Sequence, residues 1–276
     1  QHQWIQQVVK PEVGRRCDIK VIDETPGRVS NVFEVTFQEP DLSQVNSICG
    51  LLDKKFGLQV PPGVAGIEVS VDFRSRFRDA RDRAKLFMAL TRHFDASRDV
   101  LSKYDDWPRF TFGDGEGETV GAIGRKKGRP DLDDAYLMSV EADRLPFVDA
   151  CYYVGAKEAD IRWRIMDKVV DTQNRAAGTF DSLDDIDKRV RIEVTLDRSA
   201  IVGLGVHYLT DLPRLRFAQL QSKFFSFVLP TFADASYSRA GTLRAIKFMH
   251  ERKREQKFLA TGVIGLAAMD GAWARR

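Results

Sequence analysis

Carboxylates occupy alternate positions in two short segments that have the pattern of β-strands. Residues 66–73, GIEVSVDF, place Glu68 and Asp72 on one face, and residues 189–196, RVRIEVTL, place Glu193 in the same way, because strand residues two apart point to the same side. The opposite faces are apolar. Carboxylates that gather on a sheet repel one another, so a cation or basic neighbours must offset the repulsion. Oxygen ligands of this kind suit Mg²⁺ or Mn²⁺, which can polarise a phosphodiester oxygen.

Basic side chains share these faces. Arg191 lies two positions from the glutamate of its segment, and residues 161–168, IRWRIMDK, place Arg164 and Lys168 on one face and Asp167 on the other. Arginine and lysine in such a setting can contact phosphate oxygens. The alternative is that each polar face is simply the solvated side of a strand. The sequence does not tell whether the three segments are neighbours in a sheet.

The composition is that of a soluble globular protein: 276 residues, 43% hydrophobic and 30% charged, with a net charge of +3, enough for one large domain or two small ones. This charge is too small to establish a nucleic-acid partner. Two local clusters are more basic, and we expect both to contact DNA, although for the second a solvated helix face is an equal alternative. They consist of Arg125, Lys126, Lys127 and Arg129, and of Arg252, Lys253 and Arg254.

Three cysteines share no metal-ligand spacing, which argues against a zinc site or a disulfide framework and favours a reducing, cytoplasmic setting. No apolar run is long enough for a membrane span, and no signal peptide is recognisable. The chain begins with Gln1 rather than methionine, so we expect a shortened chain without its flanking domains.

Strands and helices alternate along the chain, which predicts an α+β fold with a central, mostly antiparallel sheet and helices on one side. The two halves share a loose strand-and-helix pattern, so a pseudo-duplicated domain is an alternative. Strands are predicted at residues 18–23, 31–37, 66–73, 150–155, 161–168 and 189–196, helices at 41–56, 80–94, 211–229 and 238–259, a glycine-rich loop or β-ribbon at 113–130 and a polar connection at 171–187.

Four motifs in one order resemble a known family. They are GIEVSVD at residues 66–72, YVGAKEAD at 153–160, RIMDK at 164–168 and RIEVTL at 191–196. In order and spacing they are similar to the trans-acting replication initiators, a family that includes initiators of rolling-circle plasmids, filamentous-phage replication proteins and relaxases of integrative elements. The resemblance covers about residues 64–230, so we divide the chain into a nicking domain at 1–235 and a basic helical extension at 236–276.

The resemblance implies an activity and a set of site residues. A tyrosine of the family attacks one strand of single-stranded or hairpin origin DNA, stays joined to the 5′ end and leaves a free 3′ hydroxyl, which host helicase and polymerase then use. Mg²⁺ or Mn²⁺ on acidic residues assists. The implied metal ligands are Glu68, Asp72 and Glu193, and the implied phosphate contacts are Arg164, Lys168 and Arg191. The oligomeric state, including a dimer, stays open.

One position departs from the family pattern. The nucleophilic tyrosine belongs in the motif that here reads RIMDK, where this chain has Met166, and a thioether cannot form the covalent bond to phosphate. Three tyrosines are candidates instead: Tyr153, the best placed by motif, Tyr152 and Tyr208. Alternatively, the protein binds DNA without cutting it, or it is a metal nuclease that uses water, or the strand register is shifted. We expect Trp163 to be a core residue, with stacking on unpaired bases as the alternative.

Overall fold

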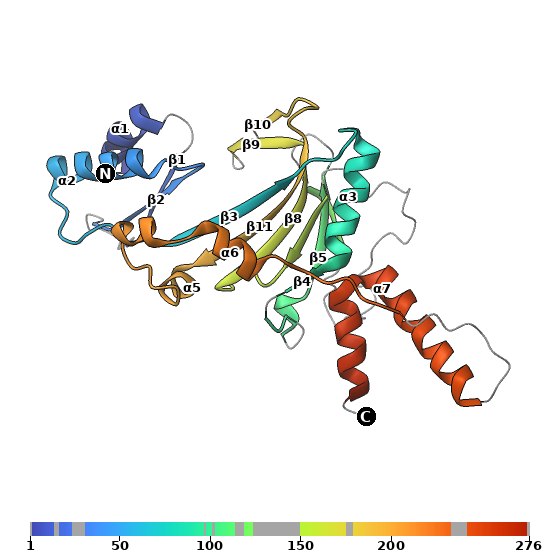
Figure 1. The fold of residues 1–276 in the computed structure, drawn as a ribbon. Helices are drawn as coiled ribbons and strands as arrows, with labels where there is room; N and C mark the ends of the chain where they lie inside the picture. The colour runs from blue at the N-terminus through green and yellow to red at the C-terminus, as the bar shows by residue number, and fades with distance from the viewer. Residues whose placement is uncertain are drawn as a thin grey trace. The chain divides into compact units, whose positions relative to one another are not determined.

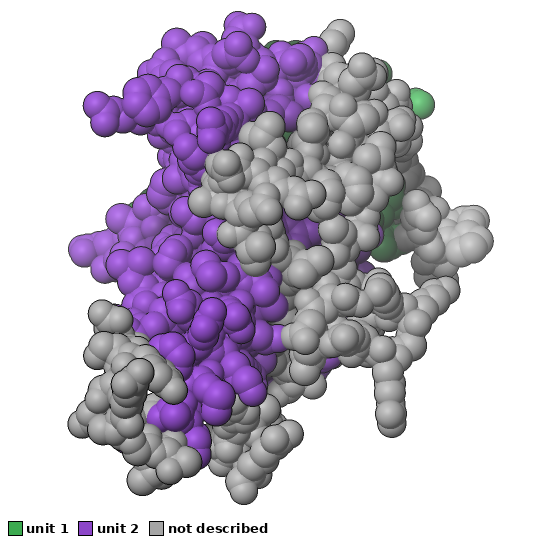
Figure 2. All heavy atoms as spheres, turned by 90° about the vertical axis from the view of Figure 1, so that its right-hand side faces the viewer, with its two compact units in different colours: residues 1–67, 197–215 green, residues 68–196, 216–276 purple. Residues whose placement is uncertain are grey.

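The structure is a computed structural model that describes residues 2–13, 17–23, 31–96, 98–100, 103–113, 119–123, 150–174, 179–232 and 242–274. Its contacts divide the chain into two compact units, which have different colours in Figure 2. The first comprises residues 1–67 and 197–215, and the second comprises residues 68–196 and 216–276. This division differs from the one we drew at residue 235 from the family resemblance, because by contacts the C-terminal segment groups with the sheet. None of the described helices is long and apolar enough to cross a membrane.

The described part of the first unit holds three α-helices, a 3-10 helix and a hairpin. Helix α1 (His2–Val13) precedes strands β1 (Cys17–Val21) and β2 (Phe33–Phe37), which pair antiparallel. Helix α2 (Leu42–Phe56) begins where Asp41 accepts hydrogen bonds from the backbone N–H groups of Ser43 and Gln44, at 2.7 and 3.1 Å, as an N-cap residue does. Helix α5 (Arg198–Val202) and the 3-10 helix η2 (Leu209–Arg214) complete this unit.

The second unit is built on a six-stranded sheet. The strand order is β3 (Gly66–Phe73), β11 (Arg189–Asp197), β8 (Ile161–Lys168), β7 (Cys151–Val154), β5 (Arg109–Gly113) and β6 (Thr119–Ile123). The pairs from β11 to β6 are antiparallel. Strand β3 also runs against β11, because Glu68 contacts Thr195 while Asp72 contacts Arg191. The predicted α+β fold with an antiparallel central sheet is confirmed.

The core of this unit lies between one face of the sheet and helix α3 (Ala80–His93), which runs alongside the strands in Figure 1. Phe87 of α3 meets Phe110 of β5 with ring centroids 6.3 Å apart, and Trp163 of β8 packs on Phe94 at 5.9 Å. The indole N–H of Trp163 donates to the carbonyl of Phe224, at 2.8 Å. Trp163 is therefore a buried core residue, as expected, and is not placed to stack on bases.

The second unit contains further elements besides the sheet and α3. They are β4 (Phe94–Asp95) paired with β12 (Ser226–Phe227), the hairpin of β9 (Val170–Asn174) and β10 (Thr179–Ser182), η1 (Tyr104–Asp106), α6 (Phe217–Phe224) and α7 (Thr242–Ala274). Helix α7 is interrupted at Gly262, whose φ of 69° and ψ of −168° are not helical. Beyond this residue, Val263 and Leu266 pack with Phe258 and Phe232 in a small apolar cluster.

Several segments differ from the prediction, including the last helix, which extends to Ala274. Residues 211–229, expected as one helix, form a 3-10 helix, a short α-helix and a strand, because proline at position 213 cannot donate a helical hydrogen bond. The polar connection at 171–187 contains the hairpin of β9 and β10. Helix α1, with Pro11 inside it, was not predicted at all.

Candidate functional site

The sheet face opposite helix α3 carries the polar residues of the strands, and we call it the polar face. Strand alternation separates it from the core: Val190, Ile192 and Val194 of β11 are fully buried on the other side. The charged residues of the polar face are Glu68 and Asp72 on β3, Arg189, Arg191 and Glu193 on β11, Arg162, Arg164 and Lys168 on β8 and Arg109 on β5. The face thus brings together the charged sheet residues that we assigned to metal binding and to phosphate contact.

One row of residues crosses four strands of this face. Glu193 of β11 is opposite Arg164 of β8, Arg164 is opposite Tyr153 of β7, and Tyr153 is opposite Arg109 of β5. The guanidinium of Arg109 lies 4.6 Å from the centre of the Tyr153 ring, within the range of a cation–π contact. The phenol is therefore placed between two arginines.

Arg164 and Glu193 form the central ion pair of the row. The Nε of Arg164 donates to Oε2 of Glu193 at 2.7 Å, and its Nη2 donates to the same oxygen. Only 4% of the Glu193 side chain is exposed, against 35% for Arg164. Burial raises the pKa of Glu193 above its ordinary value although the charge of Arg164 opposes this shift. For Arg164, burial favours the neutral form, but the charge of Glu193 outweighs it and raises the pKa.

Asp72 is held by two arginines. Arg191 donates to both of its oxygens, from Nε at 2.5 Å and from Nη2 at 2.7 Å, and the Nε of Arg189 lies 2.8 Å from Oδ2. Burial pushes the pKa of Asp72 upward, but the hydrogen bonds and charges of Arg191 and Arg189 outweigh it, so the pKa lies below its ordinary value. Such a bidentate pairing is the geometry in which guanidinium groups bind carboxylates and phosphates best.

The predicted metal ligands Glu68, Asp72 and Glu193 share the polar face, but as they stand they do not fit a metal ion. The carboxylates of Asp72 and Glu193 are occupied by arginine, and Glu68, half exposed, lies 4.0 Å from Arg164 and 3.4 Å from the hydroxyl of Thr195. Among the described residues, no three His, Cys, Asp or Glu side chains are grouped closely enough to hold a metal. The side-chain arrangement instead offsets the carboxylates with arginines.

Of the three candidate tyrosines, only Tyr153 lies on the polar face. Tyr152 points into the core, where its ring is 4.7 Å from that of Phe110, and Tyr208 belongs to the other compact unit. Burial is the main cause that raises the pKa of Tyr153, and the nearby Arg164 and a hydrogen bond with Thr111 act in the opposite direction. Tyr153 therefore carries its proton at neutral pH.

The neighbouring row contains Met166, the position at which the resemblance led us to expect a tyrosine. Met166 lies between Arg191 on β11 and Cys151 on β7, on the polar face beside Tyr153. Strand β8 therefore has the side-chain alternation expected from the sequence, with Met166 and Arg164 on one face. Lys168, at the end of β8, pairs with Asp171 at 2.8 Å.

Asp167 is on the opposite face, as strand alternation predicted. Its Oδ1 accepts a hydrogen bond from the Nε of Arg83 on α3 at 2.5 Å, and both side chains are about nine-tenths buried. Burial raises the pKa of Asp167, although the charge of Arg83 counteracts the shift. Asp167 is a core residue that ties a helix to the sheet and takes no part in the polar face.

The two basic clusters stand apart from the sheet residues. Residues 125–129 lie outside the described residues, so their expected role in DNA binding stays a prediction. In α7, Arg252 and Lys253 are exposed. Arg254 instead donates to Asp270 at 3.1 Å and to Glu251 at 3.3 Å, so it connects the two parts of the kinked helix.

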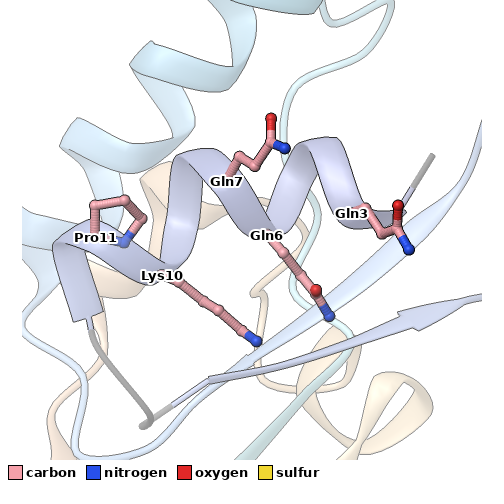
Figure 3. A pocket seen from close by; sticks show the side chains of 5 residues that line it. All are labelled: Gln3, Gln6, Gln7, Lys10 and Pro11. Atoms are coloured by element: carbon pink, nitrogen blue, oxygen red, sulfur yellow. The ribbon is translucent and has the colours of Figure 1, made fainter.

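A shallow surface hollow occurs on α1 in the first unit (Figure 3). It is lined by Gln3, Gln6, Gln7, Lys10 and Pro11. This lining contains neither a carboxylate nor a nucleophile, and it offers no chemistry comparable to that of the polar face.

Three charged residues of the polar face were not assigned to the site from the sequence: Arg162, which lies in a predicted strand, Arg109 and Arg189. Arg109 begins a strand of only five residues, RFTFG, which we did not predict. Arg189 was inside a predicted strand, two positions before Arg191, and its alternation with that residue was a usable signal.

Comparison of the chain with models of known families, with curated proteins and with solved structures finds no match.

Proposed function

We propose that the protein binds a DNA strand on the polar face and that Tyr153 cuts and rejoins that strand, as in replication initiators. The observation that carries this proposal is the position of Tyr153 between Arg164 and Arg109, on a face that has more cations than carboxylates. Six arginine and lysine residues are there, against the carboxylates of Glu68, Asp72 and Glu193, with Asp171 at the edge and Asp197 at the end of β11. Guanidinium groups beside a nucleophile suit a reaction that develops charge on phosphate oxygens.

The reaction balances without water or an oxidant. The Oη of Tyr153 attacks phosphorus and forms a phosphotyrosine ester with the 5′ side of the strand, while the bond from phosphorus to the 3′ oxygen breaks. The phenolic proton is transferred overall to the leaving 3′ oxygen, which becomes a hydroxyl. Reversal of these steps rejoins the strand. Arg164 and Arg109 would stabilise the negative charge on the non-bridging oxygens in the transition state.

The predicted Mg²⁺ or Mn²⁺ has no step in this proposal. A divalent ion would supply charge stabilisation at the phosphate if Glu68, Asp72 and Glu193 released their arginine partners. The arginines already supply positive charge on the same face. We therefore expect cleavage, if Tyr153 carries it out, to survive the removal of divalent ions.

A second function is favoured by two specific observations. The family's tyrosine position holds Met166, and burial raises the pKa of Tyr153, which opposes its activation. Both observations suit a protein that binds origin DNA and does not cut it. The same arginines would then contact phosphates without a chemical step.

The experiment uses end-labelled single-stranded and hairpin oligonucleotides with a randomised core, incubated with Mn²⁺ or with EDTA. A covalent adduct in denaturing gels, mapped to Tyr153 by mass spectrometry and absent from Tyr153→Phe, supports strand transfer. Tyr208→Phe is the matched control and keeps the adduct. Binding without cleavage in all samples supports the second function. Cleavage without an adduct, and only with Mn²⁺, refutes both and indicates a metal nuclease. The absence of any binding also refutes both.

A further inference from the structure

A short arginine-rich loop connects β3 to α3 in the second unit. Its sequence is RSRFRD, residues 74–79, and it begins two positions after Asp72 of the polar face. Phe77 at its centre is 68% exposed, which makes it the most exposed phenylalanine among those described. A single exposed apolar side chain is common on protein surfaces, so the significance of Phe77 depends on its neighbours and not on its exposure alone.

The loop is held in a defined conformation. Asp79 caps α3 by accepting a hydrogen bond from the N–H of Asp82 at 2.7 Å, and Asp82 in turn accepts one from the N–H of Phe77 at 3.4 Å. Arg78 has a φ of +56°, a left-handed conformation that is uncommon outside glycine. At the other end, Arg74 donates to the carbonyl of Ile186 at 2.5 Å. Phe77 is thus presented to solvent by a backbone whose conformation costs energy.

The arginines of the loop differ in their pairing. Arg74 lies 3.8 Å from a carboxylate oxygen of Asp187. Arg76 and Arg78 form no ion pair within the described part of the chain, and the guanidinium of Arg76 stacks over the Phe77 ring at 5.4 Å. An exposed aromatic ring flanked by two unneutralised cations matches the chemistry of an unpaired nucleotide, which has a flat base and a charged phosphate.

The loop also continues from the polar face. Strand β3 carries Asp72 into the cluster of Arg189 and Arg191, and the chain enters the loop directly after Phe73. Arg74 is tied to residues 186 and 187, which shortly precede β11. A strand bound along the polar face therefore has the loop at one end of its path.

We infer that this loop is a clamp for single-stranded DNA, in which Phe77 stacks on an unpaired base while Arg76 and Arg78 contact the adjacent phosphates. The inference rests on the proposed binding of DNA to the polar face and adds a preference for unpaired over duplex DNA. Stacking recognises the face of a base and tolerates any sequence, whereas a paired base has both faces covered by its neighbours in the duplex.

The test measures the affinity of the full-length chain for two DNA ligands by fluorescence anisotropy. One ligand is a fluorescent oligo(dT) of about 20 nucleotides, and the other is its duplex with oligo(dA). We expect Phe77→Ala to weaken single-strand binding about 5- to 100-fold and to leave duplex binding within about twofold, while Phe77→Trp retains single-strand binding. Arg76→Ala with Arg78→Ala lowers the slope of log affinity against log salt by about 0.7 per lost phosphate contact.

Phe56→Ala is the matched control, because Phe56 on α2 is also exposed, at 43%, and carries Lys55 over its ring at 5.5 Å. Equal single-strand affinity of Phe77→Ala and wild type, or an equal loss on single strand and duplex, overturns the clamp. The variant Lys168→Ala distinguishes the clamp at Phe77 from the binding of DNA to the polar face. If only Lys168→Ala weakens binding, the clamp fails and polar-face binding stands. If only Phe77→Ala does, polar-face binding fails. If neither does, both fail.

Discussion

The two faces of the central sheet both contain buried ion pairs, yet the pairs are organised differently. On the face under α3, Arg83 and Asp167 form one pair among apolar residues, and Arg83 is the only ion-pair partner of Asp167 among the described residues. On the polar face, Asp72 is shared by two arginines and Glu193 is within 4 Å of two. The isolated pair fixes a helix on the sheet. The shared pairs form a network.

The number of partners determines how readily an ion pair can open. A buried charge with one partner has no alternative when the partner leaves, so the pair cannot open without a large cost. In the network, a carboxylate that loses one arginine keeps another nearby, so an arginine can turn to a different anion at moderate cost. A phosphate group is such an anion. The network is therefore suited to ligand exchange, and the isolated pair is not.

Arg83→Ala tests this contrast most directly. The substitution leaves the carboxylate of Asp167 buried without its partner, and we expect a loss of about 3–5 kcal/mol in the free energy of unfolding. Guanidinium denaturation followed by the fluorescence of the buried Trp163 measures it. As a control, Arg83→Met combined with Asp167→Leu restores stability to within about 1 kcal/mol, because no buried charge remains. A loss below about 1 kcal/mol for the single variant contradicts the interpretation.

Arg164→Ala applies the same test to the polar face. Glu193 stays 3.7 Å from Arg191 after the substitution, and about a third of the Arg164 side chain is exposed. We expect a loss of about 1–2 kcal/mol, clearly smaller than for Arg83→Ala. The same denaturation experiment measures it. An equal or larger loss would show that the network is as rigid as the isolated pair.

The acid pH range distinguishes Asp72 from Asp167, because their pKa values shift in opposite directions. The lowered pKa of Asp72 stabilises the fold above about pH 4, and this contribution is lost as pH falls through the folded pKa. The raised pKa of Asp167 gives a contribution that is present below about pH 4 and lost as pH rises through the folded pKa. The stability difference between wild type and Asp72→Asn should therefore shrink on acidification, and that for Asp167→Asn should grow. Urea denaturation from pH 3 to 7 measures both stability differences. If the two differences change in the same direction with pH, the opposite pKa shifts of Asp72 and Asp167 are refuted.

Asp72→Asn should also affect DNA binding, with the smallest effect of the series. Removal of this charge releases Arg189 and Arg191 for phosphates, so we expect the affinity for oligo(dT) to rise about two- to fivefold, with a steeper salt dependence. Fluorescence anisotropy at two salt concentrations detects the change. Asp18→Asn, an exposed position in the first unit, is the control. A lower affinity for Asp72→Asn would indicate that Asp72 serves the DNA site directly.

Strand alternation was enough to predict which residues share the polar face. It assigned Glu68 and Asp72 to one side of β3 and placed Asp167 opposite Arg164, and the structure has both arrangements. The strands themselves were predictable because apolar residues alternate along them over eight or nine positions. The expected α+β class follows from the same periodicity.

The pairing of side chains could not be predicted in this way. Which arginine meets Asp72 depends on the register between β3 and β11, whose residues are more than 100 positions apart, as Asp72 and Arg191 show. The pattern of a single strand does not predict contacts between strands. The sequence was therefore equally compatible with carboxylates that bind a metal ion and with carboxylates that pair with arginines. The hairpin of β9 and β10 was missed because polar residues dominate it, which hides the alternation.

The conformation of Gly262 has a consequence for the C-terminal segment. Without it, the 33 residues of α7 would form a straight rod about 50 Å long, and Val263 would be carried away from Phe258. The positive φ of one glycine reverses the chain instead, so that Arg254 reaches Asp270 sixteen positions later. The dihedral angles of one residue thus divide the helix into two parts that pack on each other around a small apolar cluster.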